Sequence, residues 1–171
     1  SEFLGSLLEH IFLTLNSHSL PNMKIMIEPG RSIVANAGTT LYTVGSTKTT
    51  INHKNYVFVD GSMADHIRTV LYGAHYTALL ANRVDDICDT KYTVTGKACE
   101  SGDIIIKEAF LPTCEKGDIL AVFSTGAYHY TMSSNYNRLP RPAVIFVHDD
   151  HVRIVVKRET YQDLIRNDIG E

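Results

Sequence analysis

The 171-residue sequence predicts a mainly β fold preceded by one α/β unit. A single helix–strand–helix pattern occupies residues 1–38, and the rest consists of short, β-branched runs separated by turns. Strands with this spacing are typical of an antiparallel β-sandwich or Greek-key barrel. A complete α/β (TIM) barrel takes roughly 250 residues. We therefore expect residues 1–38 to be the last unit of an incomplete α/β barrel and residues 39–171 to form a β-rich C-terminal domain.

The composition is that of a soluble globular protein. Hydrophobic residues make up 44% and charged residues 20%, and the net charge of −3 is spread over both signs. Because there is no basic stripe and no long apolar run, we expect neither nucleic acid nor a membrane as a partner. The three cysteines cannot all pair, and their spacing fits no zinc site. We expect free thiols in a reducing cytoplasm and no bound metal.

Residues 1–38 show the helix–strand–helix pattern of an α/β unit. Residues 6–15 carry apolar side chains at helical spacing, and Lys24–Ile27 is a short apolar run typical of a buried parallel strand. A loop, Glu28–Ser32, follows, and residues 33–37 read as a short helix ended by Gly38. One such unit cannot close a parallel sheet by itself, so we expect this sequence to be part of a longer protein.

The remaining residues alternate between strands and turns. Two segments, 64–72 and 160–166, read as helices, and residues 148–151 read as the turn of a hairpin. The expected strands are 40–44, 56–59, 92–95, 104–106, 119–123, 143–147 and 152–157.

Glu28, Gly30 and Arg31 lie between the expected strand and the expected helix. Gly30 permits close approach of a ligand to the backbone, and free amides at a helix start favour an anion. Arg31 adds a guanidinium suited to phosphate or carboxylate. A plain turn with a solvated ion pair remains an equal alternative.

Cys99-Glu100-Ser101-Gly102-Asp103 places a thiol and two carboxylates at a break between two strands. Loops held by a rigid sheet carry much of protein chemistry. The alternative is a small buried cysteine followed by ordinary turn residues.

One further pair of residues and one single tyrosine are candidates for ligand binding. Arg68 and Tyr72 have i, i+4 spacing, so a helix would place them on one face, where they could hold a carboxylate. Tyr128 follows a Gly-Ala step at the end of a strand. The alternatives are a surface arginine packed on a tyrosine and a tyrosine that caps the core.

The order of these motifs closely resembles the C-terminal part of the bacterial diaminopimelate decarboxylases. These enzymes belong to the pyridoxal-phosphate decarboxylases with an alanine-racemase-like fold, and the resemblance runs from about residue 25 to residue 169. The motifs that carry it are Glu28-Pro29-Gly30-Arg31, Asp60-Gly61 with Arg68 and Tyr72, Cys99 to Asp103, Gly126-Ala127-Tyr128, residues 132–137, and Arg141-Pro142.

The resemblance implies a pyridoxal 5'-phosphate cofactor and a homodimer with shared active sites. Glu28 would face the pyridine nitrogen, Gly30 and Arg31 would lie at the phosphate, and Tyr128 would contact the cofactor. Cys99 would enter the neighbouring subunit's site and protonate the carbanion after decarboxylation. Residues 1–38 would then be the remnant of the cofactor-binding barrel.

The resemblance further implies decarboxylation of meso-2,6-diaminopimelate to L-lysine and carbon dioxide. The substrate would contact Arg31, Arg68, Tyr72, Glu100 and Tyr128.

Two alternatives remain. One is an ornithine- or arginine-type decarboxylase, although those relatives typically carry Asp after the reactive Cys, where this chain has Glu100. The other is a non-catalytic β-domain module that binds or regulates a partner. The family's Schiff-base lysine lies on the first barrel strand, outside this sequence, so we expect the 171-residue piece alone to be inactive.

Overall fold

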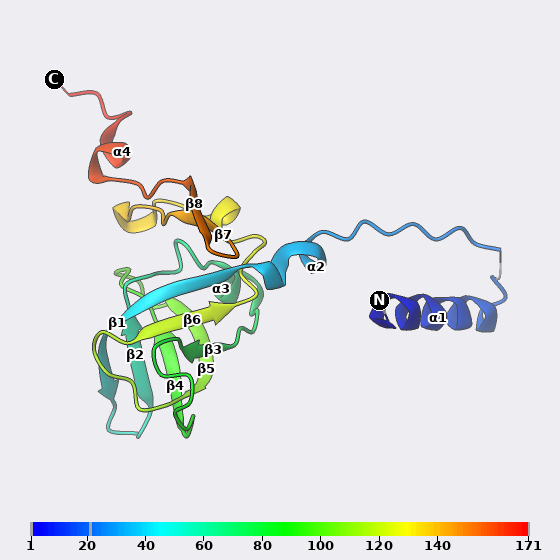
Figure 1. The fold of residues 1–171 in the computed structure, drawn as a ribbon, viewed down its shortest axis with the longest axis horizontal. Coiled ribbons are helices and arrows are strands. Elements are labelled where there is room, and N and C mark those ends of the chain that lie inside the picture. Colours follow the sequence, from blue (N-terminus) through cyan, green and yellow to red (C-terminus); the bar gives the residue numbers. More distant parts are fainter. Residues whose placement is uncertain (1, 21, 171) are drawn as a thin grey trace.

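A computed structural model describes residues 2–20 and 22–170 and shows a β-domain with a separate N-terminal helix (Figure 1). Helix α1 covers Glu2–Ser17. Residues 23–30, which have no regular secondary structure, lead into α2, Arg31–Val34, and the 3₁₀ turn η1, Ala35–Ala37. The predicted helix over residues 6–15 is confirmed and is longer at both ends. None of the described helices is long and apolar enough to cross a membrane.

Six strands form one mixed sheet in the order β3-β6-β1-β2-β4-β5. Strands β2 and β4 run parallel, and the other neighbouring pairs are antiparallel. The mainly β class is therefore confirmed, although the sheet is not purely antiparallel. The strands are β1 Thr39–Thr49, β2 Asn55–Val59, β3 Ala78–Leu80, β4 Thr90–Thr95, β5 Ile104–Leu111 and β6 Ile119–Phe123.

Strand β1 changes partner along its length, which bends the sheet. Residues 39–43 pair with β6, whereas Val44 and residues 46–49 pair with β2, with an irregularity in the register at Gly45. A bulge of this kind increases local twist and curvature. The two edge strands, β3 and β5, come into contact, so the sheet nearly closes into a barrel.

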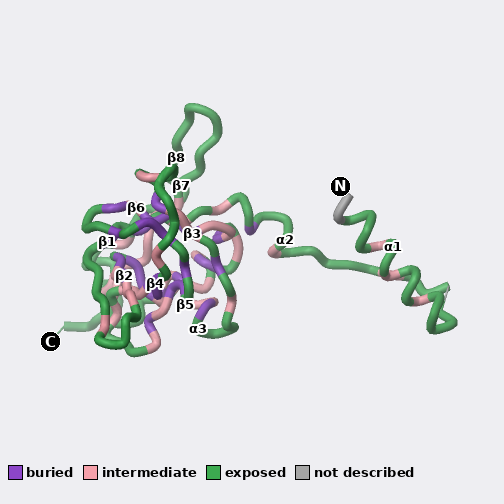
Figure 2. Tube along the Cα trace, turned by 90° about the horizontal axis from the view of Figure 1, so that it is seen from below, coloured by how far each residue is buried: buried purple, intermediate pink, exposed green. Residues whose placement is uncertain are grey.

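The core lies inside this barrel (Figure 2). Its most deeply buried apolar side chains are at most 1% exposed, and each comes from a strand of the sheet. They are Val44, Val57, Leu80, Val94, Ile105, Leu111, Leu120 and Val122.

The C-terminal part begins with two 3₁₀ turns, η2 at Tyr130–Met132 and η3 at Tyr136–Arg138. Strands β7, Val144–His148, and β8, His151–Val156, then form the predicted hairpin, which projects from the barrel (Figures 1 and 2). The last helix, α4, covers Tyr161–Ile165, inside the predicted segment 160–166.

Several expectations about the elements need correction. The predicted strand Lys24–Ile27 is wrong: these residues pair with no described strand, and Met26 is 76% exposed. A parallel strand requires neighbours, and the described part of the chain places none beside these residues. The predicted helix 64–72 is helical only over α3, Arg68–Tyr72, and strand β3 was not predicted. Strands β1 and β5 each continue five residues beyond the predicted 40–44 and 104–106.

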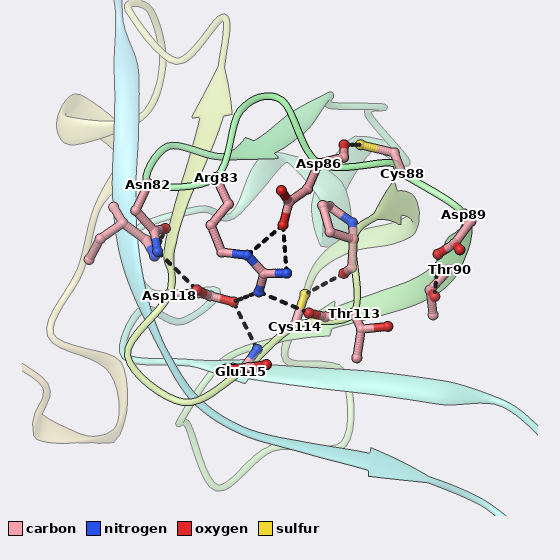
Figure 3. Close-up of polar contacts among 12 residues, drawn as sticks. Asn82, Arg83, Asp86, Cys88, Asp89, Thr90, Thr113, Cys114, Glu115 and Asp118 are labelled. Carbon is pink, nitrogen blue, oxygen red and sulfur yellow. Dashed lines mark hydrogen bonds and ion pairs between the residues drawn. The ribbon is translucent and has the colours of Figure 1, made fainter.

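A polar corner joins the ends of β3 and β6 (Figure 3). Asp118 accepts hydrogen bonds from Asn82 Nδ2 at 2.9 Å, Arg83 at 3.1 Å and the Glu115 amide at 2.8 Å. Arg83 also binds Asp86 at 2.7 Å. The corner therefore fixes the loops at one end of the barrel.

Candidate functional site

Arg68, Tyr72 and Tyr128 come together at one end of the barrel. The Arg68 guanidinium lies 4.9 Å from the centre of the Tyr72 ring and 5.3 Å from the centre of the Tyr128 ring. A guanidinium over an aromatic face is attracted by the ring quadrupole. The i, i+4 spacing correctly predicted that Arg68 and Tyr72 share a helix face. It did not reveal that Tyr128 joins them.

Helix α3 holds this arginine in place. The buried Thr69 hydroxyl donates a 2.6 Å hydrogen bond to the Ile105 carbonyl on β5. Gly73 ends the helix in the left-handed conformation, with φ of 61°, which glycine adopts at low cost. The Thr69 bond thereby ties this short helix to the barrel.

The position of Tyr128 is fixed by the segment that follows β6. Its φ of 61° lies in the left-handed region, which non-glycine residues seldom adopt. Just before it, the Gly126 amide donates a 2.9 Å hydrogen bond to Ala35, and a Cβ at Gly126 would collide with the Val34 carbonyl. The segment around residue 126 therefore packs directly on α2 and η1.

Gly30 and Arg31 lie beside the same cluster. A Cβ built on Gly30 would lie 3.4 Å from the Tyr128 hydroxyl. The Nε atoms of Arg31 and Arg68 are both buried and have no hydrogen-bond partner among the described residues. Buried polar groups are normally paired, so both guanidinium groups are suited to an anionic ligand.

The expected helix after Gly30 is present as α2, and no side chain bonds to the amides at its start. Helix α2 has only four residues and no side-chain cap, so its dipole is small. The positive charge at this end of the barrel therefore comes from the two arginines.

A buried aromatic cluster, His66, Tyr76 and His129, lies against these arginines. The ring centres of His66 are 4.5 Å from Tyr76 and 4.6 Å from His129. Burial, together with the charges of His129 and Arg68, lowers the pKa of His66 to about 3. Burial and both arginines also lower the pKa of His129. Both imidazoles are therefore neutral near pH 7.

The Cys99–Asp103 turn is anchored by Asp103. This residue is 4% exposed and accepts hydrogen bonds from the amides of Met63 and Ala98, the latter at 2.7 Å. Burial raises its pKa despite these hydrogen bonds. The Lys97 amide also binds the Gly61 carbonyl at 2.9 Å. The turn is thus tied to the chain that leaves β2.

Cys99 and Glu100 lie exposed on this anchored turn, and Cys99 is a free thiol. The Tyr136 hydroxyl donates a 2.8 Å hydrogen bond to Glu100 Oε2. This bond is the first of the causes that lower the pKa of Glu100. Sequence reasoning did not include Tyr136 in the site, because nothing in its spacing marks it.

The predicted site residues therefore fall into two groups. The first, called the Arg68 group here, contains Gly30, Arg31, Arg68, Tyr72 and Tyr128, and the second is the pair Cys99 and Glu100. Within the described residues, no hydrogen bond or ion pair links Cys99 or Glu100 to Arg68. Glu28 belongs to neither group: it is exposed in the extended stretch before α2. The first group can bind an anion, and the second presents a thiol and a carboxylate to whatever faces it.

Comparison with known proteins identifies the family. A family profile described as "Pyridoxal-dependent decarboxylase, C-terminal sheet domain" matches residues 15–126. The diaminopimelate decarboxylase of Bacillus subtilis (strain 168) is 48% identical over 169 residues, which are 99% of this chain and 38% of that protein. The one from Staphylococcus aureus (strain COL) is 56% identical over 146 residues, which are 85% of this chain and 34% of that protein.

Among solved structures, a diaminopimelate decarboxylase from M. jannaschii in complex with L-lysine superimposes with a TM-score of 0.78 and 34% identity. The match covers 94% of this chain and 37% of that one. The chain therefore spans little more than a third of the length of these relatives. Because the family profile covers more than half of the chain, the protein belongs to the pyridoxal-dependent decarboxylases and contains their C-terminal sheet domain.

Proposed function

We propose that this chain is the C-terminal part of a diaminopimelate decarboxylase, which converts meso-2,6-diaminopimelate to L-lysine and carbon dioxide. The observation that carries the proposal is the position of Arg68 against Tyr72 and Tyr128. A guanidinium with a buried, unpaired Nε is suited to a carboxylate. Diaminopimelate has a second, distal carboxylate that needs such a partner, whereas ornithine has none.

The residues around Arg31 fit a pyridoxal 5'-phosphate cofactor. Arg31, Gly30 and the Tyr128 hydroxyl would hold its phosphate, since they lie together and Arg31 Nε lacks a partner. Glu28 would bind the pyridine nitrogen. When bound, the cofactor supplies an electron sink for the electrons of the carbon–carbon bond that breaks when carbon dioxide leaves.

Substrate contacts would come from both groups of residues. Arg31, Arg68, Tyr72 and Tyr128 would bind the carboxylates and orient the substrate. Glu100 would bind the distal ammonium, because its exposed carboxylate has a lowered pKa and stays charged.

Cys99 would protonate the carbanion that decarboxylation leaves. A thiol can act as a general acid when it is held within reach of the reacting carbon. Because the described structure does not join Cys99 to the Arg68 group, we propose that Cys99 and Glu100 complete the active site of a second subunit. The enzyme would be a cytoplasmic homodimer with shared sites.

Residues 1–38 would be the end of the cofactor-binding barrel, and residues 39–171 the β-domain. Two features of the first segment support this division. Leu7 and Phe12 on α1 are 40% and 47% exposed, and the apolar stretch before α2 lacks strand partners. An upstream barrel would cover both, and it would carry the Schiff-base lysine.

Two other functions are weaker. An ornithine- or arginine-type decarboxylase would not need Arg68 for a distal carboxylate. A binding module without catalysis would not need an exposed thiol and a charged carboxylate on an anchored turn.

The test uses the full-length protein with pyridoxal 5'-phosphate and each candidate substrate. We expect release of carbon dioxide and L-lysine from meso-diaminopimelate, with little release from ornithine or arginine. Arg68→Met should lower kcat/KM for diaminopimelate about 100-fold, because a charge-assisted pair worth roughly 3 kcal/mol is lost. Faster turnover of ornithine than of diaminopimelate would contradict the proposal.

A further inference from the structure

We propose that Tyr136 is a positioning residue that orients the Glu100 carboxylate toward the substrate ammonium. The identity of the substrate rests on the proposed function. The positioning role of Tyr136 rests on the geometry around Glu100. Tyr136 lies 36 residues further along the chain, in the 3₁₀ turn η3.

Both oxygens of the Glu100 carboxylate are held. Oε2 accepts the 2.8 Å bond from the Tyr136 hydroxyl. Oε1 accepts a 3.3 Å bond from the Gly102 amide and a 3.4 Å bond from the Ser101 hydroxyl. A carboxylate has about four lone-pair sites, so an oriented acceptor remains available on the exposed side. Without Tyr136, Oε2 would lose its only partner among the described residues.

Tyr136 is itself fixed by its neighbours in the chain. Its amide donates to the Ser134 hydroxyl at 3.3 Å, and the Ser134 amide donates to the Ala64 carbonyl at 2.9 Å. On the other side, Asn137 has a φ of 58°, in the left-handed region. Such backbone conformations persist where the surrounding structure enforces them. The phenol is therefore held toward Glu100 before any ligand arrives.

Asn135 adds a second anchor to this turn. Its side-chain amide donates to the Leu139 carbonyl at 3.0 Å and to Glu159 Oε2 at 2.6 Å. Glu159 in turn binds Arg141 through two bonds of 2.8 and 2.6 Å. The segment that carries Tyr136 is thus braced independently of the Cys99–Asp103 turn.

The charges at this contact are consistent with a donor and an acceptor at neutral pH. The hydrogen bond from Tyr136 lowers the pKa of Glu100, and the same bond with Glu100 raises the pKa of Tyr136. The phenol therefore stays protonated and the carboxylate stays ionised.

The kinetic test is Tyr136→Phe in the full-length enzyme loaded with pyridoxal phosphate. We expect KM for meso-diaminopimelate to rise about fivefold with kcat changed less than about twofold, because an exposed hydrogen bond to a charged group orients binding and takes no part in the chemistry. In a Glu100→Gln background the same substitution should add less than about twofold. Tyr161→Phe, which alters a 73% exposed phenol on α4, is the matched control and should change neither constant.

A second measurement does not depend on activity. The Glu100 carboxyl is titrated by ¹³C NMR in the full-length protein, with its signal assigned by its loss in Glu100→Gln. We expect the Glu100 pKa to rise in Tyr136→Phe and to stay unchanged in Tyr161→Phe. An unchanged Glu100 pKa in Tyr136→Phe, or equal effects in the native and Glu100→Gln backgrounds, would overturn the positioning role. If diaminopimelate is not a substrate at all, the proposed function fails, and the titration still decides whether Tyr136 holds Glu100.

Discussion

At the scale of single residues, the function of the Cys99–Asp103 turn depends on which of its side chains are buried. Asp103 is 4% exposed and accepts hydrogen bonds from two backbone amides, so its role is to hold the turn. Cys99 and Glu100 are exposed. The sequence marked all three as reactive groups, because burial cannot be read from five consecutive residues. Only the packing against Met63 separates the anchor from the groups that face a ligand.

Because Cys99 is exposed, we expect its substitution to lower activity without lowering the stability of the fold. In the full-length enzyme, Cys99→Ala should lower kcat at least about 100-fold, since a general acid contributes roughly 10²–10⁴-fold. It should leave the free energy of unfolding within about 0.5 kcal/mol, as for other surface substitutions. The two measurements are steady-state kinetics and urea unfolding.

Cys88→Ala is the matched control, because Cys88 is also an exposed free thiol but lies outside both groups of site residues. It should change neither quantity. Equal losses of activity and stability in Cys99→Ala would show that Cys99 serves the packing of the turn.

At the scale of elements, the polar corner around Asp118 joins β3 to β6. Burial works to raise the pKa of Asp118, but the hydrogen bonds from Asn82 and the Glu115 amide and the charge of Arg83 outweigh it and lower the pKa. A carboxyl whose folded pKa is lowered stabilises the fold above its ordinary pKa. That stabilisation is lost as the pH falls through the folded pKa.

We therefore expect Asp118→Ala to lower the free energy of unfolding at pH 7 by about 2 kcal/mol, because it removes the acceptor of the Glu115 amide and a partner of Arg83. The difference from the native protein should shrink as the pH falls below 3.8, because the carboxyl of the unfolded chain then takes up a proton, and it should vanish below the lowered pKa of the folded carboxyl. Urea unfolding at pH 7 and pH 3 measures both effects. Asp85→Ala, at an exposed position in the neighbouring loop, is the control. A constant difference at both pH values would contradict this account.

Elements were predictable from the sequence where local pattern decided the outcome. The hairpin β7–β8 follows from two apolar runs around residues 148–151, and Arg68 and Tyr72 share a face because helical spacing requires it. Residues 24–27 do not form the predicted strand, because the neighbouring strands that they need would have to come from an upstream barrel. Tyr136 was missed because its contact with Glu100 spans 36 residues. Periodicity carries no information about such pairs.

At the scale of the whole molecule, the buried cluster of His66, Tyr76 and His129 couples stability to pH. The pKa of His66 is lowered to about 3, whereas an unfolded histidine titrates near 6.5. The unfolded chain therefore binds a proton that the folded chain does not, and this favours unfolding as the pH falls from 6.5 toward 3.

His66→Phe should reduce this pH dependence. In the window between about pH 5.5 and 3.5, one proton corresponds to about 1.4 kcal/mol per pH unit. Phe is close to His in shape and can keep the edge-to-face contacts with Tyr76 and His129. Thermal or urea unfolding at four or five pH values measures the slope. A slope that is the same in the native protein and in His66→Phe would show that His66 is not neutral in the fold.

We propose that the Arg68 group of one subunit and the Cys99–Glu100 pair of another form one active site. The direct test mixes two full-length variants, Arg68→Met and Cys99→Ala, each of which should keep only about 1% of the native activity alone. After subunit exchange, half of the dimers would be mixed, and each mixed dimer would hold one intact site. We predict recovery of about a quarter of the native decarboxylase activity, since half of the sites in half of the dimers are whole. No recovery in dimers verified to be mixed would contradict the claim.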